Sequence, residues 1–284
     1  MKLIECPRDA MQGIKQLIPA DLKADYINQI LNVGFDTIDF GSFVSPKAIP
    51  QLQDTAQVLK KLNLAESKSK LLAIIANTRG AKDACAFDEI TYLGFPFSIS
   101  ETFQQRNTNS SIQESLIRVE EIQNLCIKHK KQLVVYISMA FGNPYGDVWN
   151  SEIVIKWTKK LSDMGIKIIA LADTIGCSNP ENITYLFSNI IPEFKNVEIG
   201  AHLHSTKEKA NEKIDAAYKS GCQRFDVAIH GFGGCPMAAD DLTGNLATED
   251  LESYFIKNNI PLNLDTKALQ IAYEGSWKIF NNYH

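Results

Sequence analysis

The stretch Ile166–His204, IKIIALADTIGCSNPENITYLFSNIIPEFKNVEIGAHLH, contains one complete strand–helix–strand unit. Ile166–Ala172 and Glu198–His204 are short apolar runs, the pattern of buried strands. Pro180–Phe194, between them, has the apolar spacing of a helix. A helix that links two strands in this way lets them lie parallel in one sheet. The unit therefore predicts an α/β fold.

The same unit recurs along the whole chain. Eight runs have the length and composition of short strands, namely Lys2–Cys6, Thr37–Phe40, Leu71–Ala76, Phe95–Ser100, Leu133–Ser138, Ile166–Ala172, Glu198–His204 and Arg224–Ile229. Helical patterns separate most of them, including Leu22–Val33, Ile112–His129, Glu152–Met164, Pro180–Phe194 and Lys207–Ser220. Eight such units predict closure into a (β/α)8 TIM barrel. An open doubly wound sheet is the alternative, but no GxGxxG motif follows the first strand.

The end of the chain adds one element to this barrel. Thr248–Lys257 has the pattern of the eighth helix, and Thr266–Asn281 has that of one more helix. We expect this last helix to pack beside the barrel, as an extension that starts at about residue 262. No long polar linker interrupts the sequence, so we predict that residues 1–284 form a single catalytic domain.

Composition and charge narrow the class of protein. Hydrophobic residues make up 45% of the 284 and charged residues 22%, which is ordinary for a globular protein with a sizeable core. The net charge is −4 and the densest basic cluster, Lys128–Lys131, falls at a helix end, so we expect no nucleic-acid partner. The six cysteines form no CxxC pair, which favours reduced thiols. Without a signal-like start or an apolar run of about 20 residues, we expect a cytoplasmic protein with no membrane partner.

His202 and His204 are the most informative pair of side chains. They are separated by one residue in a predicted strand, and side chains two apart on a strand point to the same face. Two imidazoles on one face are a ready pair of ligands for a divalent metal. A hydrogen-bonded pair without a metal is the alternative interpretation.

The other unusual polar residues also follow the ends of predicted strands. In a (β/α)8 barrel the active site forms at these ends, because the carboxyl ends of all eight strands meet at one mouth. We therefore expect one cluster at the mouth, built from Arg8, Asp9, Asp39, Ser138, Asp173, Thr174, His202, His204, Cys235 and Asn245.

Asp9 is the natural third ligand beside the histidines, and Asn245 is a fourth through its amide oxygen. Oxygen and imidazole ligands suit Mg²⁺ or Mn²⁺ better than Zn²⁺, which prefers four-coordinate sites richer in thiolate or imidazole. For Asp9 the alternative is a helix N-cap, and for Asp173, beside Thr174, it is a simple turn.

Arg8 and Cys235 carry the predicted chemistry. Arg8 beside a metal-bound carboxylate supplies a fixed positive charge that can stabilise an enolate or carboxylate oxygen, and a surface ion pair is the alternative. Cys235 lies in the glycine-rich run Gly231–Pro236, which presents a thiol rather than burying it. A thiol can donate a proton to a carbanion near neutral pH, and a structural cysteine is the alternative.

The motifs together resemble those of a known family. They are Glu5–Asp9 (ECPRD), Ser42–Lys47 (SFVSPK), Asp173–Gly176 (DTIG), Ala201–His204 (AHLH), Gly231–Pro236 (GFGGCP) and Gly244–Asp250 (GNLATED). The chain resembles the 3-hydroxy-3-methylglutaryl-CoA lyases, within the metal-dependent lyase and synthase superfamily on a TIM barrel, over almost its whole length. The HxH and DTxG pieces are shared with isopropylmalate, homocitrate and citramalate synthases. The cysteine loop and the GNLATED segment are more specific to the lyases.

The resemblance implies a role for each site residue. It implies a divalent cation, Mg²⁺ or Mn²⁺, on Asp9, His202, His204 and Asn245. It implies that Arg8 stabilises the enolate, that Cys235 is the lyase cysteine, and that Asp173 assists proton movement from the C3 hydroxyl. His202 then doubles as an acid–base group, and Asp39 is the catalytic acidic residue of strand two. We predict further contacts with an acyl-CoA substrate from Gln12, Lys15, Lys47, Ser138 and Thr174.

The activity implied is cleavage of 3-hydroxy-3-methylglutaryl-CoA into acetyl-CoA and acetoacetate, a step of leucine degradation, by a homodimer. A Claisen-type synthase that joins acetyl-CoA to a 2-oxoacid, or a lyase for a related acyl-CoA, is one alternative, and a non-catalytic barrel is another. Three departures from the family pattern stand out: Cys6 fills a shortened turn, Asp39 replaces a common glutamate, and the loop from Cys235 to Asn245 is about one residue longer.

Overall fold

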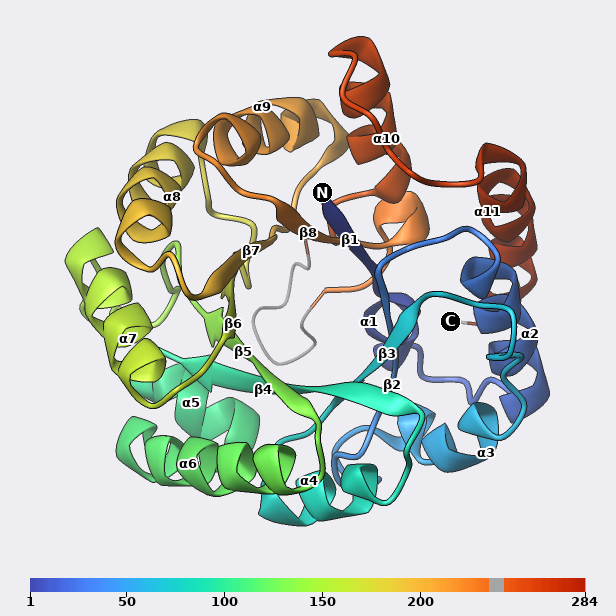
Figure 1. Ribbon diagram of the computed structural model, residues 1–284, viewed down its shortest axis with the longest axis horizontal. Coiled ribbons are helices and arrows are strands. Elements are labelled where there is room, and N and C mark those ends of the chain that lie inside the picture. Colours follow the sequence, from blue (N-terminus) through green and yellow to red (C-terminus); the bar gives the residue numbers. More distant parts are fainter. Residues whose placement is uncertain (235–242, 284) are drawn as a thin grey trace.

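The computed structural model describes residues 1–234 and 243–283. Eight parallel strands close into a barrel in chain order, with β1 hydrogen-bonded to β8 (Figure 1). The predicted fold class, a (β/α)8 TIM barrel with an extra C-terminal helix, is confirmed. The strands are β1 (Lys2–Glu5), β2 (Thr37–Ser42), β3 (Lys70–Ile74), β4 (Ile90–Ser98), β5 (Gln132–Ser138), β6 (Ile168–Ala172), β7 (Glu198–His202) and β8 (Arg224–Val227).

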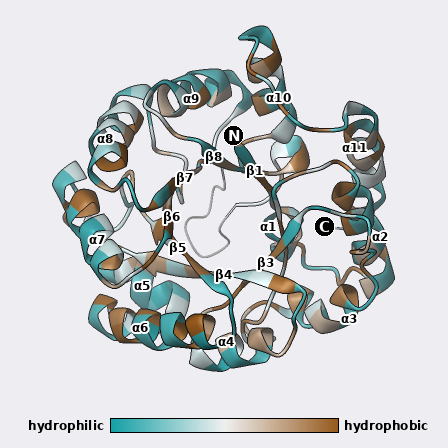
Figure 2. Ribbon diagram, viewed as in Figure 1, coloured by the Kyte–Doolittle hydropathy of each residue, from teal (hydrophilic) through white to brown (hydrophobic). Residues whose placement is uncertain are grey.

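The helices form a ring outside the strands (Figure 1). They are α1 (Pro7–Gln12), α2 (Ala20–Leu31), α3 (Thr55–Leu59), α4 (Thr78–Cys85), α5 (Glu101–Thr108), α6 (Ile112–Lys128), α7 (Ser151–Asp163), α8 (Pro180–Glu193), α9 (Lys207–Lys219), α10 (Thr248–Lys257) and α11 (Thr266–Phe280), with the 3-10 helices η1 (Pro50–Leu52) and η2 (Ile229–Gly231). Hydrophilic and hydrophobic bands alternate along these helices in Figure 2. The apolar bands are buried, as Val154 and Leu161 of α7 are, because each helix covers the apolar outer face of the strands.

The fourth strand is longer than the sequence predicts. β4 runs from Ile90 to Ser98, whereas the apolar run predicts Phe95–Ser100. Gly94 lies in the middle of β4 and is a weak strand former by itself. In the folded barrel a Cβ at this position would lie 2.5 Å from Cδ1 of Ile74, so the glycine lets the neighbouring strand approach.

Five strands, β1, β3, β4, β7 and β8, end one or two residues earlier than expected, and the last two matter for the site. β7 ends at His202 and β8 at Val227, because the chain leaves the sheet there. His204 instead forms an isolated bridge with Asn245, and η2 follows β8. The short helices α1 and α5 also lie where the sequence shows no clear periodicity, since one has six residues and the other is mostly polar.

The C-terminal helix packs beside the barrel against α2, where the rings of Tyr26 and Phe280 lie 6.1 Å apart (Figure 1). It is also joined to η2 through His230. The imidazole of His230 lies 4.0 Å from the ring of Tyr273 and 4.0 Å from that of Trp277, measured between centroids. The last helix thus supports the start of the loop that follows β8. None of the helices in the described residues has both the length and the apolar composition needed to cross a membrane.

Candidate metal and active site

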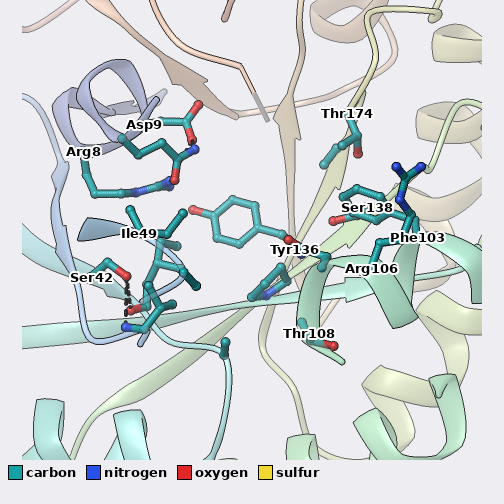
Figure 3. Close-up of a pocket in the computed structure, with 18 of the residues that line it drawn as sticks. Arg8, Asp9, Ser42, Ile49, Phe103, Arg106, Thr108, Tyr136, Ser138 and Thr174 are labelled. Atoms are coloured by element: carbon teal, nitrogen blue, oxygen red, sulfur yellow. Dashed lines mark hydrogen bonds and ion pairs between the residues drawn. The ribbon is translucent and has the colours of Figure 1, made fainter. Parts of the chain in front are cut away.

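A cavity of about 420 Å³ opens at the carboxyl ends of the strands. Figure 3 shows Arg8 and Asp9 on one side, Arg106 and Ser138 on the other, and the ring of Tyr136 between them. The predicted site residues that line it are Arg8, Asp9, Gln12, Ser138, Thr174, His202 and His204. The convergence expected at the barrel mouth is therefore present for these residues.

Asp9, His202 and His204 form a group with metal-ligand geometry. Each offers one ligand atom, and the three atoms lie within 4.8 Å of one another. The two imidazole rings, 5.4 Å apart between centroids, remain close although His204 lies beyond the end of β7. The buried Nδ1 of His204 has no hydrogen-bond partner among the described residues. One carboxylate and two imidazoles, one of which has an unpaired buried nitrogen, fit a divalent cation.

Asn245 lies beside this group, where the sequence predicts the fourth ligand. Its Nδ2 donates to Oδ2 of Asp9 at 2.7 Å and to the carbonyl of Phe232 at 2.8 Å. The bridge between His204 and Asn245 brings the segment after the undescribed residues 235–242 against the end of β7. Backbone pairing thus places this amide next to both ligand types.

Arg8 connects the metal group to strand β2. Its Nε donates to both carboxylate oxygens of Asp39, at 3.1 and 3.0 Å, and its Nη2 also donates to Asp39. Its Nη1 donates to Asp9 at 2.7 Å and to Oε1 of Gln12 at 2.9 Å. Gln12 in turn donates to Asp9 at 2.6 Å. Because Arg8 is buried, it is a fixed cation between two carboxylates rather than a surface ion pair.

Electrostatics set the protonation states of the group. Burial would raise the pKa of the Asp9 carboxyl, but the charges of Arg8 and the histidines outweigh burial and lower it to about 2. Burial, together with the neighbouring His202, lowers the pKa of His204 to about 4. Burial raises the pKa of Asp39 to about 6, against the lowering effect of Arg8. At neutral pH these values favour a carboxylate at Asp9 and a neutral imidazole at His204, the forms that bind metals.

Asp173 lies behind the cavity wall rather than on it. It is fully buried, and its Oδ2 accepts from Nζ of Lys213 at 2.9 Å and from the hydroxyl of Ser178. Lys213 also donates to the carbonyl of His204 at 2.7 Å. The structure therefore connects Asp173 to the metal group through backbone support of His204, and its proton-transfer role stays a prediction.

The remaining predicted residues fall in three places. Ser138 and Thr174 line the cavity, and Oγ1 of Thr174 accepts from the amide of Met139 at 2.8 Å. Lys15 and Lys47 are exposed and do not line it, so their substrate contacts stay predictions. Cys235 lies outside the described residues.

The structure adds cavity residues that sequence reasoning missed. α5 contributes Phe103, Arg106 and Thr108, and the guanidinium of Arg106 lies 5.2 Å from the ring centroid of Tyr145. The sequence feature that could have predicted α5 is its N-cap residue, Ser100, whose hydroxyl accepts a hydrogen bond from the amide of Phe103.

Comparisons with known proteins show the family to which the chain belongs. Residues 3–274 match the family described as HMGL-like. The chain is 32% identical to the "3-hydroxy-3-methylglutaryl-CoA lyase, cytoplasmic" of Rattus norvegicus, over 98% of this chain and 80% of that protein. It is 33% identical to the "Hydroxymethylglutaryl-CoA lyase YngG" of Bacillus subtilis, over 90% of this chain and 86% of that protein.

Solved structures show the same likeness. An HMG-CoA lyase from Acinetobacter baumannii, in complex with coenzyme A and 3-methylmalate, superposes with a TM-score of 0.90 at 31% identity, covering 98% of this chain and 90% of that one. The HMG-CoA lyase of Bacillus subtilis gives 0.90 at 31% identity, over 98% and 92%. The resemblance inferred from the motifs is confirmed, and the chain belongs to the HMGL-like family.

Proposed function

We propose that this protein cleaves 3-hydroxy-3-methylglutaryl-CoA into acetyl-CoA and acetoacetate by a metal-assisted retro-Claisen reaction. The observation that carries the proposal is the cluster of Asp9, His202, His204 and Arg8 at the mouth of a barrel whose relatives bear the name of this activity. Coenzyme A in the complex of the Acinetobacter baumannii relative supports an acyl-CoA substrate.

The residues divide the work by their chemistry. Asp9, His202, His204 and Asn245 would hold a divalent cation, which would supply a Lewis acid to the hydroxyl group of the substrate. Mg²⁺ and Mn²⁺ fit this donor set of two oxygens and two imidazole nitrogens without a thiolate. His202 lies on the cavity wall and is the acid–base group that we assign to the hydroxyl proton.

Arg8 and Cys235 act on the part of the substrate that becomes acetyl-CoA. When the C2–C3 bond breaks, its electron pair moves onto the thioester as an enolate, and the guanidinium of Arg8 stabilises the new negative charge. Asp39 and Gln12 hold that guanidinium in place. A proton from the thiol of Cys235 then completes acetyl-CoA, while acetoacetate carries the former C3 as a ketone.

Incubation of purified protein with 3-hydroxy-3-methylglutaryl-CoA and Mg²⁺ or Mn²⁺ tests the proposal through acetoacetate production. We expect product that disappears with EDTA and returns with either cation. If instead pyruvate or 2-oxoisovalerate consumes acetyl-CoA, the protein is a synthase. If neither reaction occurs, the proposed substrate is wrong, and the remaining alternatives are a lyase for a related acyl-CoA and a non-catalytic barrel. Comparison of the two cations in the same assay identifies the better one.

We further infer a single-domain homodimer that works in the cytoplasm in leucine degradation. The support is the name "cytoplasmic" of several relatives and the chemistry of the proposed substrate. Light scattering tests the dimer, and the growth of a deletion strain on leucine tests the pathway.

A further inference from the structure

A series of buried charged side chains runs from Arg224, at the amino end of β8, to the metal group. On β8, Arg224 and Asp226 lie two residues apart and so face the same side of the sheet, the barrel interior. Asp226 is the register partner of His202 on β7, and its Oδ2 lies 3.3 Å from Nδ1 of that imidazole. Nε of Arg224 lies 3.7 Å from Oδ1 of Asp226. Each member therefore contacts the next.

The barrel makes room for this series of side chains and holds its Arg224 end. A Cβ at position 200 would lie 2.7 Å from Cδ of Arg224, so Gly200 leaves the space that the arginine chain fills. Nη1 of Arg224 donates to Glu198 at 3.0 Å, and Glu198 accepts from Lys2 at its other oxygen at 2.5 Å. A guanidinium buried to this extent is costly unless its partners are fixed, and here carboxylates flank it on both sides.

The contact with His202 has a defined consequence for metal binding. In a neutral imidazole one ring nitrogen carries the proton and the other offers a lone pair. A carboxylate that accepts from Nδ1 keeps the proton there, so the lone pair stays on Nε2. The same contact fixes the rotation of the ring on the cavity wall.

We propose that Asp226, held by Arg224, is a positioning residue that fixes the tautomer and ring orientation of His202 for the divalent cation. The inference rests on the metal site of the proposed function. Neither residue lines the cavity, so both act through His202 and neither is itself catalytic.

Removal of the carboxylate is the first test. In Asp226→Ala we expect the Kd for Mn²⁺, measured by electron paramagnetic resonance, to rise about 10- to 100-fold. Asp226→Glu, which keeps the acceptor, should recover a large part of that loss. Asp215→Asn is the matched control because it alters a half-buried carboxylate of α9 that pairs with Lys219 and Tyr254 and not with the metal group. The Kd of that variant for Mn²⁺ should stay unchanged.

The tautomer gives a readout that a merely structural role would not change. With ¹⁵N-labelled histidine in the metal-free protein at about pH 9, we expect the proton of His202 on Nδ1. In Asp226→Ala the signal should move toward Nε2–H or a mixture. Arg224→Met, paired with Glu198→Gln to remove the other carboxylate that this arginine contacts, leaves Asp226 without its cation and should shift the signal in the same direction by a smaller amount.

Three results would overturn the proposal. One is an unchanged Mn²⁺ affinity in folded Asp226→Ala, and another is a wild-type imidazole protonated on Nε2. The third concerns Cys6, whose thiol also lies within 4.8 Å of ligand atoms of His202 and Asp226. Two tightly bound Mn²⁺ ions per chain, or a thiolate charge-transfer band with Co²⁺, would make Asp226 a ligand instead.

These outcomes are independent of the lyase assay. If the protein fails to cleave 3-hydroxy-3-methylglutaryl-CoA while its Mn²⁺ affinity still depends on Asp226, the positioning role stands and the proposed function is wrong. If cleavage occurs and the Mn²⁺ affinity does not depend on Asp226, the proposed function stands and the positioning role is wrong.

Discussion

Lys213 on α9 forms a buried ion pair with Asp173, the residue that follows β6, with Nζ 2.9 Å from Oδ2. The same ammonium donates to the carbonyls of His204 and Gly176, at 2.7 and 3.2 Å. One lysine from the outer ring of helices thereby joins the ends of two strands directly behind the metal group.

Lys213→Met should destabilise the protein by about 3–5 kcal/mol, because it leaves the carboxylate of Asp173 buried and uncompensated. Urea unfolding measures this free energy. The double variant Lys213→Met with Asp173→Asn should recover part of the loss, since no net charge is then buried. A single variant as stable as the wild type would show that the pair has no structural role.

Arg8→Lys should lower kcat/KM about 10²- to 10³-fold. The substitution keeps a positive charge but cannot contact Asp39 and Asp9 together, as the guanidinium does. Steady-state kinetics with 3-hydroxy-3-methylglutaryl-CoA measures the change. Arg79→Lys, on the outer surface of α4, is the matched control and should keep full activity. Equal rates for Arg8→Lys and the wild type would remove Arg8 from the reaction.

Cys235→Ser should lower turnover about 10²- to 10⁴-fold while Mn²⁺ affinity changes little, because a hydroxyl is a far weaker acid than a thiol. Cys177→Ser, which alters an exposed thiol, serves as the control. Loss of the metal in Cys235→Ser would contradict a role confined to proton donation.

Glu5 predicts a pH dependence of stability. Burial raises the pKa of this carboxyl to about 8, although Thr248 and the amide of Ile229 donate to it. In the unfolded chain its value is near 4.5, so the folded state binds more protons between these two values. The stabilisation is complete below the lower value and is lost as the pH rises toward the higher one, by at most about 1.4 kcal/mol per pH unit.

Glu5→Gln should flatten this slope, because the amide keeps the shape of the side chain and does not titrate. Urea unfolding of both proteins between about pH 5 and 8 gives the comparison. Parallel curves for the variant and the wild type would mean that Glu5 does not set the dependence.

Local pattern was enough to predict the barrel. Eight apolar runs separated by helical spacing have few alternatives, because parallel strands joined by helices must bury both faces. The boundaries of the strands were predicted less accurately where a local sequence signal conflicted with the pairing between strands. Because glycine is a weak strand former, the predicted strand starts only after Gly94. In the structure Gly94 lies within β4, because both neighbouring strands pair with it.

Some residues of the candidate site could be predicted from the sequence, and others could not. Arg8, Asp9, His202 and His204 were predicted because each stands at a strand end, and strand ends of a barrel share one mouth. Asp226 and Lys213 have no such mark in the sequence. In the sequence Asp226 is a single polar residue within an apolar strand, and Lys213 has the ordinary pattern of a surface lysine on an amphipathic helix.

The sequence by itself determined the barrel, the candidate ligands and the family, because these depend on spacing along the chain and on short motifs. Only the tertiary structure decided how the side chains pair: Arg8 with Asp39 as well as Asp9, Lys213 with Asp173, and Asp226 with His202. The physical reason is distance. These pairs lie up to about 40 residues apart in the sequence, and only the packing of neighbouring strands and helices brings their charges within a few ångströms, where burial makes each pairing obligatory.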